Sequence, residues 1–206
     1  VNMDVKWDFA MIQLNYVDWR HASRNNHAEY LYNELAKRNI PVNIMEPLLG
    51  GRLANVHDHI AAILKQRRPD LSIASWAFRF AGSPKHVLTV LSGMTYMEHL
   101  QDNIRTYSPL EPLTEKEKHF LYETAGLIKE YPTVPCNDCK YCMPCPYGID
   151  IPSILLHYNK CVNEGNIPQS QQDDNYRKAR QAYLVGYDRS VPNIRQANHC
   201  INCGQC

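Results

Sequence analysis

The chain has 206 residues, with 22 basic and 21 acidic side chains and a formal net charge of +1 at pH 7. This length allows one large domain or two modest ones, and the near-zero charge favours neither a nucleic-acid nor a membrane-surface partner. No apolar run reaches the ~18 residues that a spanning helix needs. There is also no signal-peptide pattern. We therefore expect no nucleic-acid partner and no membrane partner.

Residues 1–112 alternate strand and helix patterns. Short apolar runs of buried-strand length occur at 7–14, 40–48 and 86–93. Apolar residues at helical spacing occur at 27–39, 71–82 and 95–104. This alternation is typical of parallel βαβ units. Three such strands are too few for a closed barrel, so we expect an incomplete α/β region.

Helix boundaries are indicated by local signals. Thr95 with Glu98 and Thr114 with Glu117 each have the spacing of a capping box, and Gly82 is placed to follow a helix end. Prolines near residue 112 mark the end of the alternating strand and helix pattern, so we expect domains at 1–112 and 113–206. Around and beyond this boundary the sequence predicts an amphipathic helix within 107–135 that follows the Thr114 capping box, helical stretches at 152–163 and 173–186, and no strand.

The cysteines are confined to the second part of the chain. A Cys–x–x–Cys–x–x–Cys motif occurs at 136–142 and again at 200–206, and Cys145 is followed by Pro146. Thiolate sulfur suits zinc and iron–sulfur clusters, but structural zinc sites usually take two pairs separated by a longer loop. Close triple spacing favours [4Fe-4S] clusters, although only two residues precede Cys145 where the bacterial pattern has three. Zinc is the alternative.

In two-cluster ferredoxins the fourth cysteine of one motif binds the other cluster. Cys145 would then join Cys200, Cys203 and Cys206, while Cys136, Cys139 and Cys142 would hold the second cluster without a fourth ligand in this sequence. We expect the second motif to continue past Cys206. Cys161 is an alternative fourth ligand or a buried cysteine. This cysteine usage indicates a reducing, cytoplasmic compartment.

Residues 1–112 resemble the C-terminal half of an aldo/keto reductase, and the whole chain resembles the subgroup with a C-terminal 4Fe-4S ferredoxin-type domain. The phrases that carry the resemblance are "FAMIQLNYVD", "IPVNIMEPLLGGRLA", "VLTVLSGMTYMEHLQDN", "CKYCMPCPYGIDIP" and "HCINCGQC". The resemblance implies the C-terminal part of a (β/α)8 TIM barrel, its last three strands and helices. A mostly helical 4Fe-4S dicluster domain would follow.

The resemblance also implies a nicotinamide cofactor site. Gln13 would hold the nicotinamide carboxamide, the stretch 45–51 would lie along the nicotinamide and pyrophosphate, and 92–103 would meet the adenosine end. The residues implied to bind the cofactor are Gln13, Met45, Glu46, Pro47, Leu48, Gly50, Ser92, Gly93, Met94, His99, Asp102 and Asn103. Many members carry cations near the positions of Gly93 and His99, so the choice of NADP or NAD stays open.

By this resemblance the protein is an oxidoreductase that reduces a small carbonyl substrate with NAD(P)H. Two [4Fe-4S] clusters would transfer electrons, with a redox partner protein. No residue here matches the family's catalytic Asp, Tyr, Lys and His, so we nominate none as catalytic. A hydride carries two electrons whereas a cluster carries one, and the sequence shows no flavin fingerprint. The alternative is that the clusters are structural or form a docking module, and that the barrel is not a typical reductase.

Overall fold

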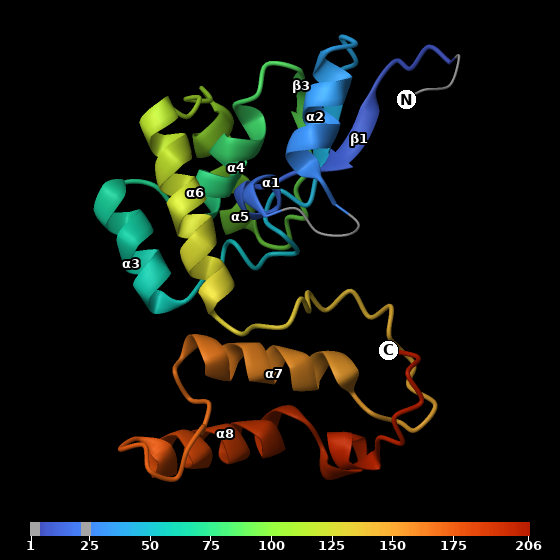
Figure 1. The fold of residues 1–206 in the computed structure, drawn as a ribbon, viewed down its shortest axis with the longest axis vertical. Coiled ribbons are helices and arrows are strands. Elements are labelled where there is room, and N and C mark those ends of the chain that lie inside the picture. Colours follow the sequence, from blue (N-terminus) through green and yellow to red (C-terminus); the bar gives the residue numbers. More distant parts are fainter. Residues whose placement is uncertain (1–4, 22–25) are drawn as a thin grey trace. The chain divides into compact units, whose positions relative to one another are not determined.

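A computed structural model describes residues 5–21 and 26–206 of the chain (Figure 1). Its internal contacts divide it into two compact units, Val1–Glu130 and Tyr131–Cys206. The helix Glu115–Glu130 (α6) falls in the first unit because it packs against several of that unit's helices. The sequence-based boundary at 112/113 lies before this helix, and the contact-based boundary lies after it.

The first unit contains a parallel three-stranded sheet in the order β1-β2-β3. Its strands are β1 (Ala10–Gln13), β2 (Val42–Met45) and β3 (Val87–Val90). Its helices, besides α6, are α1 (Tyr16–Arg20), α2 (Ala28–Ala36), α3 (Asp58–Arg67), α4 (Ile73–Gly82) and α5 (Met97–Tyr107). The parallel βαβ order predicted from the sequence is confirmed, while α1 and α3 were not predicted.

The predicted fold class is wrong. The sheet has three strands and is not closed, and no part of a TIM barrel is evident among the described residues. Both β1 and β3 pair on one side only. The alternating pattern specifies parallel units with helical connections, which open sheets and barrels share. The pattern does not specify that the edges join.

Helix α4 forms the centre of the first unit. Ser72 begins it by accepting a hydrogen bond from the Ser75 backbone N–H at 2.9 Å. The helix buries side chains on most of its circumference, including the fully buried Trp76. Such all-round burial is expected of a helix enclosed by others. Gly82 is the last residue of α4, and a Cβ there would lie 3.0 Å from the Tyr107 and Leu110 side chains, so small size is what the position requires.

The two predicted capping boxes have opposite outcomes. Thr114 and Glu117 form one at the start of α6: the Glu117 N–H donates to Thr114 Oγ1 at 3.2 Å, and Glu117 Oε2 accepts from the Thr114 N–H at 2.9 Å. The box predicted for Thr95 and Glu98 is wrong. Helix α5 begins one residue later, with Tyr96 as a cap that makes no side-chain bond.

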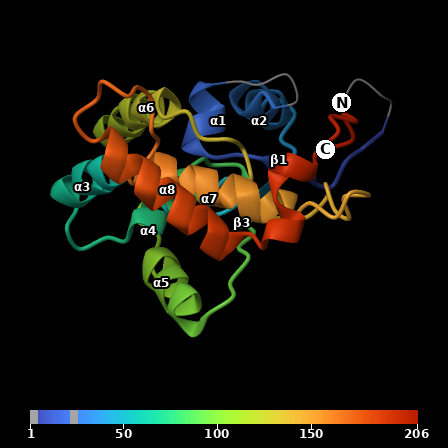
Figure 2. The same cartoon turned by 90° about the horizontal axis from the view of Figure 1, so that it is seen from below.

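The second unit consists of helices and loops. It contains α7 (Ile151–Asn163), α8 (Tyr176–Ser190) and two short 3-10 helices, η1 (Asn193–Arg195) and η2 (Ala197–His199). Helices α7 and α8 pack side by side (Figures 1 and 2). Asp150 caps α7 by accepting from the Ser153 N–H at 3.3 Å. None of the helices in the described ranges has the length and apolar character to cross a membrane.

The contact between α7 and α8 is centred on His157. Its ring lies 5.0 Å from the Tyr183 ring and 5.8 Å from the Tyr187 ring, measured between centroids. His157 Nε2 is 2.9 Å from the Tyr183 carbonyl oxygen, to which it donates. A larger residue at Gly186 would clash with this ring, because a Cβ there would lie 2.6 Å from His157 Cε1. The two helices therefore approach through one glycine and one buried imidazole.

Candidate functional site

The carboxyl ends of the three strands lie along one edge of the sheet. Gln13 and Met45 are register partners, and the Leu14 N–H donates to the Met45 carbonyl at 3.1 Å. On the other side of β2, the Leu91 N–H donates to the Ile44 carbonyl at 2.9 Å. Ligands of open parallel sheets bind outside this edge. The segments predicted to bind the cofactor all follow these strand ends.

The loop after β2 has an unusual backbone. Glu46, Leu49, Gly50 and Gly51 have φ values of 54°, 50°, 66° and 87°. Left-handed non-glycine residues are uncommon and cluster at ligand-binding positions. Pro47 is buried within the loop, Leu48 is partly buried, and Met45 is exposed at the strand end. The fully buried Asn15 donates from Nδ2 to the Glu46 carbonyl at 3.2 Å and so fixes the start of the loop.

A second group of polar side chains lies where β1 ends. Gln13 Nε2 is 2.7 Å from Asp18 Oδ2, and Asn15 Nδ2 is 2.8 Å from the same oxygen. Burial lowers the pKa of the nearby Arg52, and the Asp18 carboxylate acts in the opposite direction. Sequence reasoning named Gln13 as a site residue but did not name Asn15, Asp18 or Arg52, which contact it or lie close to it. The spacing Asn-x-x-Asp directly after a strand could have signalled them as a helix start.

The residues predicted to contact the adenosine end of the cofactor take part in two separate sets of hydrogen bonds. Asn103 Nδ2 donates to Ser92 Oγ at 3.0 Å, and the Thr95 N–H donates to His99 Nδ1 at 3.3 Å. These bonds bring α5 against the segment that contains Gly93 and the exposed Met94. Asp102 instead accepts from Ser72 Oγ at 2.6 Å, at the start of α4. Its carboxylate is thus engaged in a contact between helices.

The cysteine motifs of the second unit meet at a cavity of about 330 Å3. Thiols from both motifs line it, namely Cys142, Cys145, Cys200, Cys203 and Cys206. Its walls are mainly apolar and include Met143, Ile149 and Ile154. All eight cysteines of the chain are free thiols. The structure therefore brings together the four cysteines that the crossing rule assigns to one cluster, with Cys142 of the other group beside them.

The two motifs have the same backbone conformation around their central cysteine. Asp138 and Lys140 flank Cys139 with φ values of 58° and 62°. Asn202 and Gly204 flank Cys203 with φ values of 59° and 73°. Left-handed residues on both sides of a cysteine curl the chain tightly around it. The sequence repeat is thus also a repeat of local structure.

Cys136 and Cys139 do not line the cavity but lie close to Cys142. Burial raises the pKa of the Cys142 thiol, and the charges of Cys136, Cys139 and Cys206 raise it further. Thiolates gathered in this way repel one another, and a bound cation or cluster relieves the repulsion. The thiol set and apolar walls fit a thiolate-bound iron–sulfur cluster. Within the described ranges, no three His, Cys, Asp or Glu side chains converge as the ligands of a single metal ion.

Cys161 is set apart from these thiols. It is buried on α7, as one of its two interpretations predicted, and does not line the cavity. Its Sγ lies 3.4 Å from His157 Nε2, one helical turn away. Burial raises the pKa of the Cys161 thiol. Cys161 belongs to the packed contact between α7 and α8.

No protein-family model, curated protein or solved structure matches the chain. The function is therefore argued from the residues and contacts described above.

Proposed function

We propose that the protein is an oxidoreductase of aldo/keto reductase type. It reduces a small carbonyl compound with NAD(P)H and carries two [4Fe-4S] clusters for electron transfer. The observation that carries the proposal is that two cysteine motifs with the same backbone conformation present five thiols to one apolar-walled cavity. Such an arrangement suits clusters held by several thiolates.

One cluster would be held by Cys145, Cys200, Cys203 and Cys206, and the other by Cys136, Cys139 and Cys142. When bound, the clusters supply one-electron transfer. The chain's own contribution is to hold the thiols in place and to limit water around them through residues such as Ile149 and Ile154. Cys142 and Cys206, which belong to the two different ligand sets, line the same cavity, and this supports two neighbouring cluster sites.

The strand-end edge of the first unit would bind the nicotinamide dinucleotide. Gln13 would hold the carboxamide, and the left-handed loop 46–51 would approach the pyrophosphate with its backbone N–H groups. Exposed Met45 would lie against the nicotinamide ring. The role of this edge is to bind and orient the cofactor beside the carbonyl substrate.

The alternative is that the clusters are structural. The exposure of Cys139, Cys200 and Cys203 favours electron transfer, because an exposed cluster can be approached by a redox partner protein. A structural cluster needs no such access. The two functions differ in whether the clusters change their oxidation state when NADPH is added.

The test is to prepare the protein without oxygen, count iron and sulfide, and record the visible absorbance before and after adding NADPH. We expect a full iron content for two clusters. Bleaching of the absorbance would show that electrons reach the clusters from NADPH, which requires a flavin or similar mediator that accepts the hydride and passes its two electrons on one at a time. Full iron with an unchanged spectrum would support the structural alternative, and zinc without iron would refute the clusters.

Two cysteine variants test which thiols bind the iron. Cys203→Ser should lower the iron content, since it removes a thiol that lines the cavity. Cys161→Ser should leave the iron content unchanged, because that thiol is buried elsewhere. Equal iron loss in both variants would contradict the ligand assignment.

A further inference from the structure

The orientation of the Asn15 amide is fixed by the chain itself. Its Oδ1 accepts from the backbone N–H groups of Val17 and Asp18, at 3.1 and 2.9 Å. The other end of the amide must therefore be the NH2 group. That group donates to the Glu46 carbonyl and to Asp18 Oδ2. Since Asn15 is fully buried, a reversed amide would leave donors facing donors without water to separate them.

Asp18 transmits this orientation to Gln13. An ionised carboxylate only accepts hydrogen bonds. The end of the Gln13 side chain that lies 2.7 Å from Asp18 Oδ2 must therefore be its Nε2 amide group. Consequently Gln13 Oε1 is the end that is left to face a ligand.

Because Gln13 Oε1 can only accept a hydrogen bond, it favours a ligand group that can donate one. A primary carboxamide has an NH2 group to offer, whereas a carboxylate has none and would bring a negative charge towards Asp18. Gln13 is only half-buried and lies at the sheet edge beside Met45, so a ligand can reach it.

We infer that Asp18 is a positioning residue. It orients the Gln13 amide so that the site binds the carboxamide of nicotinamide more tightly than the corresponding carboxylic acid. This inference rests on the proposed function, because it concerns the same dinucleotide site. It adds a specificity determinant that contacts no ligand and acts through Gln13.

The test compares the Kd of oxidised nicotinamide dinucleotide with that of its nicotinic acid analogue, each measured by displacement of NADPH fluorescence. We expect the natural protein to prefer the carboxamide by about ten-fold, the equivalent of one hydrogen bond made or left unpaired. Asp18→Ala removes the oxygen that accepts from Gln13 Nε2, so the Gln13 amide is free to turn around. In this variant the preference should fall to about two-fold or less.

Two further variants separate positioning from a general effect. Asp8→Asn removes an exposed carboxylate and should keep the preference of the natural protein. Gln13→Leu should lose the preference, and adding Asp18→Ala to it should change nothing more, because Asp18 acts through Gln13. Additive losses in the double variant would overturn the positioning role.

The outcomes also separate this inference from the function on which it rests. A natural protein that binds neither dinucleotide nor NADPH would refute both. Binding of NADPH without discrimination between the two analogues, or an unchanged preference in Asp18→Ala, would overturn the inference and leave the proposed function standing. If Asp18→Ala fails to fold, as judged by its urea midpoint, a preference retained by Gln13→Leu alone would overturn it.

Discussion

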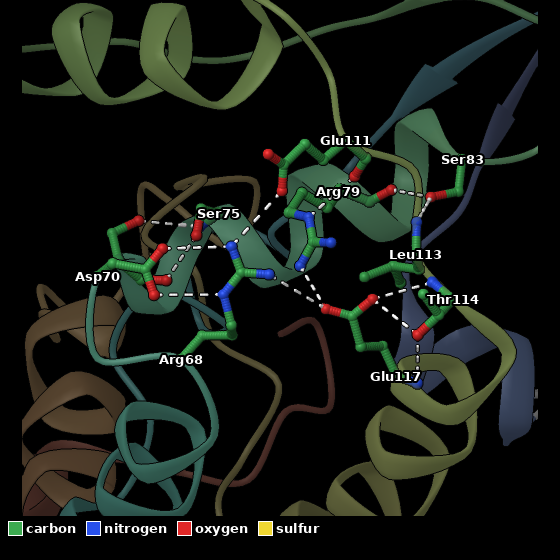
Figure 3. Close-up of polar contacts among 10 residues, drawn as sticks. Arg68, Asp70, Ser75, Arg79, Ser83, Glu111, Leu113, Thr114 and Glu117 are labelled. Carbon is green, nitrogen blue, oxygen red and sulfur yellow. Dashed lines mark hydrogen bonds and ion pairs between the residues drawn. The ribbon is translucent and has the colours of Figure 1, made fainter.

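Arg79 is the side chain whose loss should destabilise the first unit most clearly (Figure 3). It projects from α4 with 4% of its side chain exposed, and its Nη1 lies 3.0 Å from Glu117 Oε1. Its Nε donates to the Glu111 carbonyl at 3.0 Å, and its guanidinium lies 5.5 Å from the centre of the Trp76 ring. Glu117 in turn accepts both hydrogen bonds from Thr114. The pair thus joins α4 to the capped start of α6.

We expect Arg79→Met to lower the free energy of unfolding by about 3 kcal/mol, the lower end of the usual effect of removing one partner from a buried ion pair. The substitution keeps much of the apolar volume but leaves the buried Glu117 carboxylate with only the more distant and more exposed Arg68, whose Nη1 lies 3.6 Å from Glu117 Oε1. The matched control is Lys37→Met. Lys37 is 70% exposed and lies 2.7 Å from Glu34, so its pair is shorter than the Arg79 pair. Because water screens the Lys37–Glu34 pair, Lys37→Met should lower the free energy of unfolding by only about 0–1 kcal/mol.

The assay is urea unfolding followed by far-UV circular dichroism and by tryptophan fluorescence, since Trp76 lies against Arg79. The midpoint should fall with an unchanged m-value, which indicates a change of stability and not of the unfolded state. The double variant Arg79→Met with Glu117→Leu should lose less than the sum of the single effects, because no unpaired charge stays buried. Strict additivity, or an Arg79→Met effect no larger than that of Lys37→Met, would refute the reasoning.

Four other outcomes are expected. Burial by itself would raise the pKa of Glu117, but hydrogen bonds from Arg79 and Thr114 outweigh it and lower this pKa. The stability that Glu117 contributes should therefore be present above its ordinary pKa of about 4.3 and fall as acid titration passes the lowered value, with a shallower fall in Arg79→Met. Tyr16→Phe should keep or raise the urea midpoint, since in the described part of the chain the buried Tyr16 hydroxyl has no hydrogen-bond partner. Gly186→Ala should destabilise the second unit by crowding His157, whereas Gly126→Ala, where nothing in the described residues lies within 4 Å, should stabilise α6 by about 0.5–1 kcal/mol. Removing iron with a chelator should increase amide hydrogen exchange in 136–145 and 200–206, and no change there would contradict cluster binding.

The strands and most helices could be predicted because their apolar residues recur at regular spacing. Helix α1 could not, since it has only five residues and depends on the Asn15 side chain for its start. Helix α3 is mostly polar and buries only Ile60 and Leu64, which is too weak a stripe to detect. The fold class was wrong for a different reason. Local periodicity identifies βαβ units, but whether a sheet closes depends on pairing between distant strands, which no local pattern records.

The candidate sites show the same limit. Cysteine spacing identified the two loops that we propose as ligand loops, but the sharing of one cavity by Cys145 and Cys206 depends on how α7 and α8 bring both loops together. Gln13 was proposed by resemblance, but the orientation of its side chain could not be predicted. That orientation begins with a hydrogen bond from Asn15 to the backbone of Glu46, 31 residues away in the chain.

The two sites differ in what holds them before a ligand binds. At the sheet edge, the amides of Gln13 and Asn15 are already satisfied by the Asp18 carboxylate, so the protein can hold that geometry by itself. At the cysteine cavity, Cys142 lies within the field of three other thiols, and their mutual repulsion opposes the arrangement as they ionise. A positively charged group at the centre would relieve that repulsion. The strand-end site should therefore select among ligands by a fixed hydrogen-bond pattern, whereas the order of the cysteine loops should depend on the clusters that we propose they bind.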